Sequence, residues 1–547
     1  MITRIEIENF KGIAARQRID FAPITLLFGA NSAGKSTILQ SLLYLHELLE
    51  RGSADVDRTE LGGGIVELGG FARLVHRHEI SRKICLRVEF DTPDTLERFG
   101  RDLVAFPFPD LDDEVESAWM ELSVVHRTTA TFQGPIVERA VIGVNANPEP
   151  LVWLEVDPSI RDGEPFFARV NLGHPLIAEH VDADLVQWWE AISANEIVGD
   201  GGAGLGDGDG FGDGRSLPAF AIARSRNSAV PPLAEPLRVI PLGQMEELQQ
   251  ELARLQHENE QLRAGLPVDP ELEDARVDLE ARERAHEQAR TFLEMIVLGT
   301  SAQLAASLRE ALYIGPLRTI PPRGFLYERV GRVTSWADGL AAWDLLLADR
   351  LTLVERTNAW LRRLGTGSQV VVQELFDRGA DAEDLSSHHV DKTLRRLLLD
   401  SEAGLVMPSE VGAGISQVVP VVVAAVDEDW GLTLIEQPEI HVHPAVQVGL
   451  GDLFIDAVIR DGRRAFLVET HSEHLILRML RRIRETTEKE LAEGAPHFSQ
   501  DKLSVLYIEA TADGMQVRRL RVDERGAFLD PWPKGFFDER FAEVYGP

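Results

Sequence analysis

The sequence predicts an α/β fold in which segments from distant parts of the chain form one parallel sheet. The apolar run at residues 24–28 is followed by a glycine-containing loop and then by apolar residues at helical spacing, so a strand, a loop and a helix follow in order. Two further strand-like runs, at residues 432–436 and 465–469, are separated by a helix-length segment, which is the rhythm of a parallel sheet. Between these segments, β-like runs and a coiled-coil seam predict an antiparallel β lobe and an inserted helical hairpin.

The composition is that of a folded globular protein with a large negative charge. The chain has 547 residues, of which 44% are apolar and 27% are charged, so most of it can bury a core. The formal net charge of -33 repels the phosphates of nucleic acids. We therefore expect no general coating of DNA or RNA, and nucleic acid would be bound only through a local basic groove or through a partner.

Cysteine content and hydropathy predict a cytoplasmic location. Cys85 is the only cysteine, which excludes an intrachain disulfide and a cysteine-cluster metal site. The first residues alternate apolar and polar side chains and lack the pattern of a signal peptide. The most apolar run, at residues 418–426, is about half as long as a membrane span needs to be. We expect no interaction with a membrane.

Residues 1–185 are expected to form the first half of the main domain together with the β lobe. Residues 5–10 and 17–21 have the alternating pattern of paired strands, and they precede the apolar run and its helix. Several β-like runs then predict a largely antiparallel lobe; they span residues 84–90, 120–126, 140–144 and 151–156.

Residues 186–235 are expected to form a helix and a flexible acidic linker. A tryptophan-bearing helix is predicted from about residue 180 to 197, and residues 199–214 consist mainly of glycine and aspartate. This stretch resembles a calcium-binding glycine/aspartate repeat, but it is one irregular copy without stacked repeats. A flexible acidic loop is the preferred interpretation, and calcium binding is the alternative.

Residues 236–298 are expected to form the inserted helical hairpin. Apolar residues between 245 and 262 fall on alternating three- and four-residue steps, with Asn259 as the polar position of the seam. A glycine- and proline-containing break separates this segment from a second charged helical run at 271–296, which can fold back on the first. The hairpin is either a structural arm or a docking element, and the sequence favours neither. Residues 299–547 complete the main domain.

The strongest motif in the chain is a phosphate-binding loop. Gly29-Ala-Asn-Ser-Ala-Gly-Lys-Ser36 matches the P-loop pattern, with a strand before it and a helix after it. Backbone amides of such a loop cradle phosphate oxygens, the lysine neutralises the β- and γ-phosphates, and the serine hydroxyl binds Mg²⁺. The motif therefore predicts binding of ATP and Mg²⁺, with the expected nucleotide-binding residues being Gly29, Asn31, Gly34, Lys35, Ser36 and Thr37.

Acidic residues and a histidine follow two of the predicted strands. Glu436, Gln437 and Glu439 end the strand at 432–436, and His471 follows the strand at 465–469. Because the carboxyl ends of parallel strands meet at one edge of a sheet, Glu436 is expected to bind Mg²⁺ beside Ser36. Glu439 and His471 are candidates for acting on the attacking water. As an alternative, a metal site could draw on His441, His443, Glu439, His471 and His474, although their spacing matches no diagnostic pattern.

These segments together resemble the ABC-type ATPase heads of the SMC, RecF and OLD group. The resemblance covers residues 1–80 and 305–547, and it extends to a subfamily of bacterial ATPases with a short carboxyl-terminal domain of unknown function. The segments that carry it are Asn9-Phe-Lys11, Tyr313-Ile-Gly-Pro-Leu-Arg318, Val411-Gly-Ala-Gly-Ile-Ser-Gln417, Glu436-Gln-Pro-Glu-Ile-His-Val-His-Pro444, Glu469-Thr-His-Ser-Glu-His474 and Trp532-Pro-Lys-Gly-Phe-Phe-Asp538.

The resemblance implies a split head that dimerises around ATP. In that group, the signature segment of one head closes over ATP bound to another head, and Gly412, Gly414 and Ser416 are the candidates here. The usual Leu-Ser-Gly-Gly-Gln wording is absent. The resemblance also implies a partner effector, such as a nuclease in another chain, and a role in antiphage defence or DNA maintenance. The short segment after His471 lacks the aspartate pair of a nuclease.

Gln437 leads to a prediction of slow hydrolysis. In the ABC pattern a catalytic glutamate directly follows the magnesium-binding acid, and here an amide, which cannot accept a proton at neutral pH, follows Glu436. Glu439 is the nearest carboxylate that could replace it. The alternative is an ATP-dependent scaffold or sensor that does not hydrolyse ATP. A transporter motor is disfavoured by the large insertion and the missing signature wording.

Overall fold

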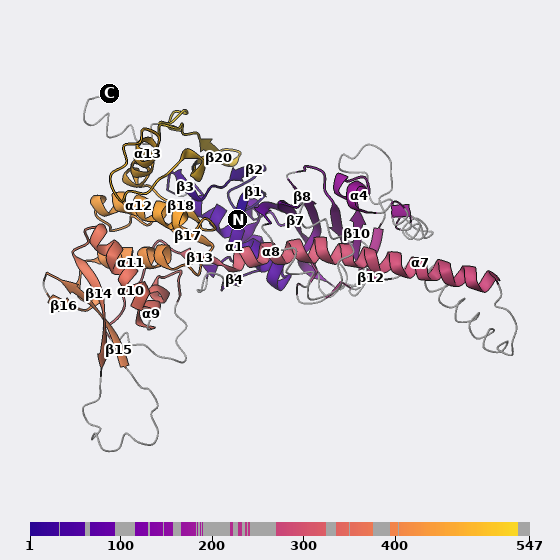
Figure 1. Cartoon of the computed structure of the whole chain (residues 1–547), viewed down its shortest axis with the longest axis horizontal. Coiled ribbons are helices and arrows are strands. Elements are labelled where there is room, and N and C mark those ends of the chain that lie inside the picture. Colours follow the sequence, from indigo (N-terminus) through magenta and orange to yellow (C-terminus); the bar gives the residue numbers. More distant parts are fainter. Residues whose placement is uncertain are drawn as a thin grey trace, which may run out of the picture. The chain divides into compact units, whose positions relative to one another are not determined.

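In the computed structural model the chain divides into two compact units, each described here by itself (Figure 1). The first unit comprises Met1–His46, Val56–His78 and Ala306–Pro547, and the second comprises Glu47–Asp55 and Glu79–Ala305. The structure describes residues 1–31, 33–60, 66–92, 115–128, 132–145, 147–156, 166–181, 183, 186–187, 189, 219–222, 228–231, 233, 236–237, 239–240, 270–323, 335–348, 351–375, 394–402 and 404–533.

The first unit is built on a six-stranded sheet that combines segments from distant parts of the chain. All of its strands are parallel to their neighbours except the last one, which pairs antiparallel. Every residue of the P-loop strand is buried, as expected for a parallel strand covered on both faces. In spatial order the strands are β13 (Ala311–Ile314), β17 (Leu432–Glu436), β18 (Ala465–Glu469), β3 (Ile24–Gly29), β19 (Leu503–Thr511) and β20 (Gly514–Leu520).

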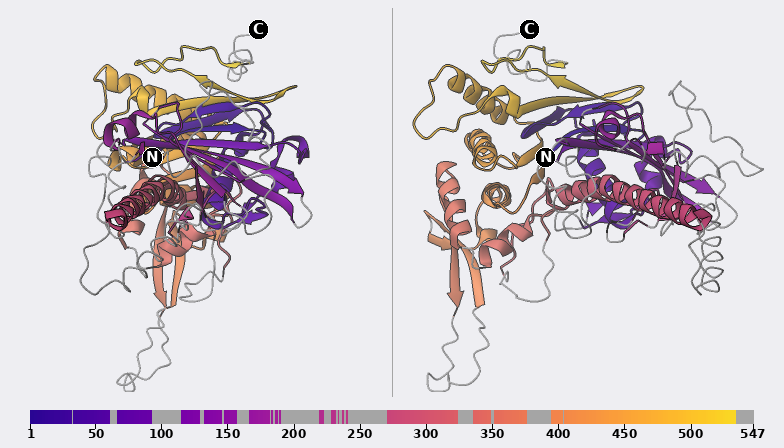
Figure 2. Two further views of the ribbon diagram at one scale, coloured as in Figure 1. Left: turned by 90° about the vertical axis from the view of Figure 1, so that its right-hand side faces the viewer. Right: turned by 45° about the vertical axis from the view of Figure 1, so that its right-hand side comes forward.

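Helices alternate along the sequence with strands of this sheet. Figure 2 gives two further views of the ribbon. The helix after the P-loop begins at Lys35, whereas Ser472 begins α13 by accepting a hydrogen bond from the Leu475 amide at 3.1 Å. Helices α12 and α13 are joined by buried ion pairs between Asp452 and Arg482, the shortest at 2.7 Å. The helices are α1 (Lys35–Arg51), α9 (Leu340–Leu347), α10 (Leu351–Arg363), α11 (Ala413–Val426), α12 (Pro444–Arg460) and α13 (Glu473–Thr487).

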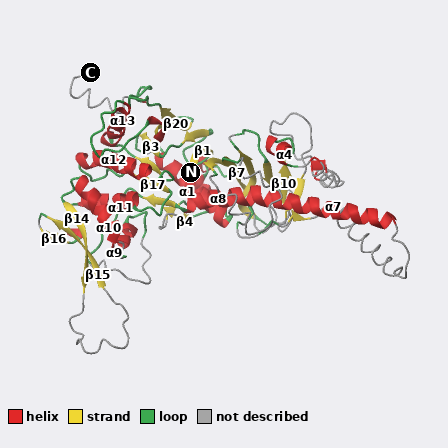
Figure 3. Cartoon of the chain, viewed as in Figure 1, coloured by secondary structure: helices red, strands yellow, loops and turns green. Residues whose placement is uncertain are grey.

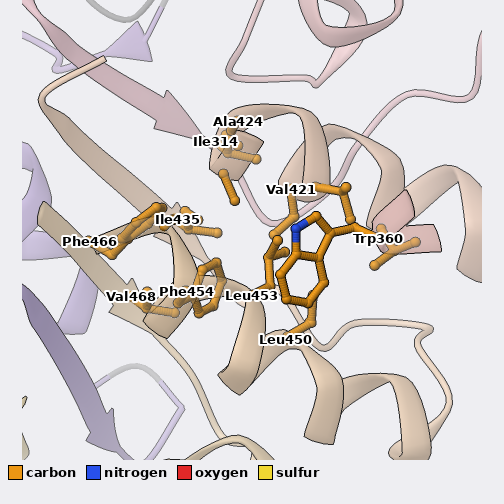
Figure 4. Packing of buried hydrophobic residues seen from close by; sticks show 14 of the residues in the cluster. Ile314, Trp360, Val421, Ala424, Ile435, Leu450, Leu453, Phe454, Phe466 and Val468 are labelled. Atoms are coloured by element: carbon orange, nitrogen blue, oxygen red, sulfur yellow. The ribbon is translucent and has the colours of Figure 1, made fainter. Parts of the chain in front are cut away.

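The core of the first unit lies between these helices and the sheet (Figure 4). Trp360 from α10 and Val421 from α11 pack with residues of α12 and of strands β17 and β18. The rings of Phe454 and Phe466 have their centroids 5.1 Å apart. Arg464 is also buried, and its two Nη atoms donate to the carbonyls that end α11, at 2.6 Å each. This guanidinium satisfies carbonyls that have no partner within the helix.

Smaller elements complete the first unit. Trp532 packs edge-on against Phe28 at 5.3 Å, while residues 534–538 of the segment that resembles the bacterial subfamily lie outside the described residues. An antiparallel sheet contains β14 (Ser368–Leu375), β15 (Leu394–Ser401) and β16 (Gly404–Val406). The other elements are β1 (Ile2–Glu8), β2 (Gln17–Asp20), β4 (Arg58–Thr59), β5 (Val66–Glu67), α2 (Phe71–Leu74), η1 (His76–His78), η3 (Pro408–Glu410) and η4 (Gln500–Lys502).

The strands of the second unit form an antiparallel succession, which confirms the predicted β lobe. Trp119 packs over Gly143, where an added Cβ would lie 2.3 Å from the indole ring, so a side chain at this position would displace the tryptophan. Figure 3 shows the strands in yellow. They are β6 (Ile84–Asp91), β7 (Ser117–Thr128), β8 (Gln133–Val144), β9 (Val152–Glu155), β10 (Phe166–Val170), β11 (Ala219–Ile222) and β12 (Val239–Ile240).

The helical part of the second unit contains the second charged helical run expected at 271–296. Helix α7 (Pro270–Leu293) continues through a π-helical turn, η2 (Glu294–Gly299), into α8 (Thr300–Arg309), and α4 (Pro175–His180) is a separate short helix. Trp189 donates from Nε1 to the Ala285 carbonyl at 3.0 Å. The expected first arm at 245–262 and the glycine/aspartate segment at 199–214 lie outside the described residues.

One helix among the described residues has the length and composition of a membrane span. It covers Glu283–Arg309, with a mean hydropathy of 1.3 over its most apolar window, and 61% of that window is buried inside the protein. Burial of this kind is equally typical of a core helix.

Candidate functional site

The P-loop has the tight geometry that its glycines permit. Gly29 ends β3 at φ +150°, and an added Cβ would lie 2.3 Å from the Ile508 carbonyl oxygen on the neighbouring strand. Gly34 has φ +97°, where a Cβ would lie 2.6 Å from the Met515 sulfur. Helix α1 begins at the next residue. Both predicted glycines therefore stand where L-residues are strained, and the loop passes close to Ile508 and Met515 of the strands beside it.

Lys35 is buried at the start of α1 and is held by oxygen atoms. Its Nζ donates to the carbonyls of Gly29 and Ala30, at 3.2 and 3.0 Å. It also lies 3.6 Å from Oε1 of Glu469. Burial lowers the pKa of Lys35, and the charge of Glu469 opposes this shift. A bound phosphate would offer the Lys35 ammonium oxygen atoms in place of these.

Two glutamates from adjacent strands meet at this loop. Glu436 and Glu469 are direct neighbours at the ends of β17 and β18. The Ser36 hydroxyl donates to Oε2 of Glu469 at 2.7 Å, and the Tyr313 hydroxyl donates to Oε1 of Glu436 at 2.8 Å. Burial raises the pKa of Glu436, and the neighbouring charge of Glu469 raises it further. Two carboxylates so close together are suited to a cation.

Arg318 connects this site with helix α11. It is buried, and Nη2 donates to the carbonyls of Glu436 and Gln437 at 2.7 and 3.3 Å. The Gln417 side chain bonds both backbone groups of Arg318, accepting from its amide at 3.2 Å and donating to its carbonyl at 2.5 Å. Burial lowers the pKa of Arg318 to about 10, while Glu439 and Glu436 oppose the shift, so the guanidinium is charged at neutral pH.

The segment after Glu436 does not continue as a strand. Gln437 has a left-handed backbone, at φ +45°. Its backbone N–H donates to the backbone carbonyl of Glu469 at 2.7 Å. Strand alternation therefore does not determine the direction of the Glu439 side chain. The chain instead turns Glu439 toward the end of β18, where its carboxylate accepts hydrogen bonds from the His471 amide at 2.6 Å and the Thr470 hydroxyl at 2.8 Å.

The candidates for acting on water have shifted pKa values. Burial raises the pKa of Glu439, while hydrogen bonds from His471 and Thr470 oppose the shift. Burial lowers the pKa of His471, and the charge of Lys35 lowers it further. The imidazole is consequently neutral at physiological pH, and it can donate or accept a hydrogen bond at the edge of the site.

The structure gives the alternative metal ligands other surroundings. His443 begins α12, accepting a hydrogen bond at Nδ1 from the Ala445 amide at 3.2 Å. His441 is exposed, with a left-handed backbone at φ +59°. Within the described part of the chain, no group of three histidine, cysteine, aspartate or glutamate residues has the geometry of a metal site.

The signature candidates lie at the start of α11. Gly412 is the exposed residue before the helix, and a Cβ on Gly414 would lie 2.6 Å from the His441 carbonyl oxygen. Ser416, in contrast, is fully buried, and its hydroxyl donates to the Pro408 carbonyl at 3.3 Å. In the single chain the helix turns this hydroxyl into the core, so a contact of Ser416 with ATP on another head stays a prediction that requires the start of α11 to move.

Asn31 and Thr37 have different positions in the P-loop region. Asn31 is exposed, whereas Thr37 is buried and its amide donates to the Gly34 carbonyl at 2.9 Å. Asn31 can therefore contact a ligand from solvent, and the Thr37 backbone closes the first turn of α1.

A basic cavity of about 670 Å³ lies in the first unit. Its lining includes Lys11, Arg73 and Arg77, together with two histidines and Glu67. Lys11 also hydrogen-bonds Gln40 of α1, and it lies near enough to Glu436 for that charge to raise its pKa, against a larger lowering by burial. The cavity concentrates cationic side chains in a chain of net charge -33.

The donor set fits ATP and Mg²⁺. Mg²⁺ prefers oxygen ligands and commonly takes only one or two from the protein, with phosphates and waters completing the shell. The Ser36 hydroxyl and the Glu436 carboxylate would supply two such ligands, and Lys35 at the amino end of α1 would supply the cation for phosphates. Arg318 Nε and Nη1, which are buried without a hydrogen-bond partner among the described residues, add positive charge behind the carboxylates.

Sequence reasoning missed four residues near this site. Glu469, Tyr313, Arg318 and Lys11 each contact or face a site residue. All four occur in the segments that carry the family resemblance, which is the signal that was available. A tyrosine within a strand, or an arginine shortly after that strand, does not by itself indicate a partner 118 to 123 residues away.

The fold and the site have the components of a P-loop ATPase, with the phosphate-binding loop and the acidic strand ends supplied by distant parts of the chain. Residues 1–95 match the AAA_15 family, described as an AAA ATPase domain. No curated protein matches the sequence.

Solved structures with similarity to the chain include SMC heads. One is the Smc head domain with an extended coiled coil, bound to the C-terminal domain of ScpA, from Pyrococcus furiosus, with 10% identity, a TM-score of 0.35, and coverage of 95% of this chain and 96% of that one. Another is the SMC head domain from Thermotoga maritima, with 7% identity, a TM-score of 0.33, and coverage of 95% and 99%.

Proposed function

We propose that this protein binds Mg²⁺-ATP at the P-loop, hydrolyses it slowly, and uses the bound nucleotide to control a partner protein. The observation that carries this proposal is the convergence of Lys35, Ser36 and Glu436 on one site, although the last comes from a distant part of the chain. A phosphate-binding cation, a hydroxyl and a carboxylate in this arrangement are the components of a P-loop ATPase.

Each residue has a role in this proposal. Lys35 faces the β- and γ-phosphates, and Ser36 with Glu436 holds Mg²⁺, which neutralises charge on the transferred phosphoryl group. The P-loop amides and Asn31 contact the phosphates. The basic cavity around Lys11 and Arg73 accepts the rest of the nucleotide, because its volume of about 670 Å³ is in the range of small-molecule sites.

Hydrolysis depends on Glu439 in this proposal. Its raised pKa brings it closer to the pH at which a general base works best. Gln437 orients the water by hydrogen bonding, and neutral His471 contacts the γ-phosphate. The hydrogen bonds that Thr470 and His471 make to Glu439 occupy its carboxylate, which is why slow turnover is expected.

The same hydrogen bonds favour a second candidate, an ATP-dependent scaffold or sensor. In that case Glu439 has a structural role, fixing the end of β18 to the turn after β17. Both candidates share the resemblance to SMC, RecF and OLD heads, which supports an ATP-sandwiched dimer or higher oligomer in the cytoplasm. It also supports a partner effector such as a nuclease, acting in antiphage defence or DNA maintenance.

Calorimetry with Mg²⁺-ATP tests the nucleotide site. Lys35→Ala is expected to weaken ATP binding at least tenfold, because it removes the charge that faces the phosphates. Arg363→Ala, on the exposed end of α10, serves as a control for loss of one positive charge and is expected to bind normally. Equal affinity of wild type and Lys35→Ala would refute the site.

Single-turnover hydrolysis separates the two candidates. The proposal predicts slow wild-type turnover that Glu439→Gln reduces further and Gln437→Glu increases. Turnover by wild type that does not exceed that of Lys35→Ala would instead establish the sensor. Fast turnover that Glu439→Gln leaves unchanged would eliminate Glu439 as the base.

A further inference from the structure

We infer that Glu469 makes ATP binding conditional on Mg²⁺, because it is an internal competitor of the phosphates for Lys35 and also orients the Ser36 hydroxyl toward the metal. This inference rests on the proposed function. The residue lies at the end of β18, between the P-loop strand and the strand that ends in Glu436.

The two oxygens of Glu469 contact the two side chains that the P-loop motif assigns to phosphate and metal. Oε1 lies 3.6 Å from the Lys35 ammonium, and Oε2 accepts the Ser36 hydroxyl proton at 2.7 Å. Both glutamate and lysine are almost completely buried, with side-chain exposures of 7% and 2%. Solvent therefore screens this pair weakly, and its electrostatic interaction is stronger than that of a surface pair.

The contact with Lys35 opposes binding of free ATP. Lys35 can direct its charge to phosphates only by weakening its pair with Glu469. The carboxylates of Glu436 and Glu439 also face Lys35 closely enough to raise its pKa. Phosphates entering without a metal would add negative charge to a buried site that already holds three glutamates. Like charges at such distances in a weakly screened site disfavour each other strongly.

The contact with Ser36 supports binding of the metal. A serine hydroxyl donates one hydrogen and retains lone pairs for a second partner. Because Glu469 takes the hydrogen, the lone pairs of the Ser36 oxygen are directed away from Glu469 and remain for Mg²⁺. A divalent cation beside Glu436 and Ser36 also offsets the repulsion between Glu436 and Glu469. The same carboxylate thus disfavours ATP alone and favours ATP with Mg²⁺.

The test compares ATP affinity with excess EDTA and with Mg²⁺. For Glu469→Gln, which retains the shape but not the charge, we expect ATP affinity in EDTA to rise. Affinity in Mg²⁺ is expected to stay unchanged or to fall. The dissociation constant in EDTA divided by that in Mg²⁺ should therefore decrease on the order of tenfold relative to wild type. Glu473→Gln, at the start of α13, is the matched control and should keep the wild-type ratio.

Other outcomes have definite meanings. If Glu469→Gln weakens ATP equally in both conditions, its role is structural and the inference is wrong. An unchanged ratio also refutes it. If Glu469→Gln does not fold, as judged by thermal unfolding without nucleotide, Glu469→Asp is used, since its shorter side chain loosens the pair with Lys35. Its ratio should fall by less than tenfold, and no fall refutes the inference. Failure of wild type to bind ATP in either condition would refute the proposed function itself.

Discussion

At the scale of single residues, the site is defined by charges removed from solvent. Glu436, Glu439 and Glu469 face Lys35, and the first two also face Arg318. Burial raises the pKa values of Glu436 and Glu439. Burying a charge costs free energy that only the opposite charges and hydrogen bonds of the site offset. We therefore expect the folded protein to gain stability when a cation binds at this site.

Glu436→Gln is expected to stabilise the protein at pH 8, because the amide keeps the shape of the side chain and removes a buried charge. Because the folded-state pKa of Glu436 is raised above 4.5, the stability that its protonated form contributes is fully present below pH 4.5 and lost as the pH rises through the raised value. The advantage of the variant should thus shrink as the pH falls from 8 toward 5.

Urea unfolding of wild type and Glu436→Gln at several pH values measures this difference. Glu473→Gln serves again as the control. Its free energy of unfolding should differ little from that of wild type, and this difference should not shrink between pH 8 and pH 5. A difference that grows as the pH falls would contradict the raised pKa.

At the scale of elements, the helices and strands that depend on one segment were predicted from the sequence. The pairing of one segment with another was not. The strand, loop and helix around Gly29 and Lys35 follow from local periodicity, and so do the strands of the β lobe. The hydrogen bond from Ser36 to Glu469 depends on which strand lies beside β3, and period-2 patterns do not state the order of strands. The orientation of Ser416 depends on where α11 begins, which is uncertain by a few residues in any sequence pattern.

Helix α11 is joined to the site by Gln417 and Arg318. Gln417→Leu is expected to lower the free energy of unfolding by about 1–3 kcal/mol, because the buried amide and carbonyl of Arg318 lose their partners. Turnover of ATP should fall more than ATP affinity, since Arg318 holds the backbone of Glu436 and Gln437. Ser416→Ala, which removes one weaker buried bond at 3.3 Å, is the control for both measurements.

A double-mutant cycle with Arg318→Met isolates the connection. If the two residues act through one another, the combined loss of turnover should be smaller than the sum of the separate losses in free energy. Strictly additive losses would show that Gln417 acts independently of Arg318.

At the scale of the whole molecule, one site is composed of two distant segments. If a second copy closes over ATP, as proposed, the exposed start of α11 is the surface that it would contact. Gly412 is suited to a test of that surface, because nothing lies within 4 Å of a Cβ added there. A side chain at this position therefore leaves the monomer intact and obstructs only what approaches from outside.

Light scattering is expected to show ATP-dependent dimers of Glu439→Gln, the variant in which hydrolysis is slowed. Adding Gly412→Trp should abolish these dimers while ATP affinity per monomer stays within threefold. Gly462→Trp is the control, since its Cβ also has open space, and it should dimerise normally. A monomer under all conditions, with ATP and at high protein concentration, would contradict the dimer.

The placement of β3 has a consequence for synthesis on the ribosome. This strand pairs with β18 on one side and β19 on the other, and its loop serine lies 433 residues before Glu469. At about 5 to 20 residues per second, the apolar strand of the nascent chain waits roughly 20 to 90 seconds for its partners. During that interval its edges are open to other chains, so chaperones that shield extended apolar segments should determine how much of this protein reaches its native state.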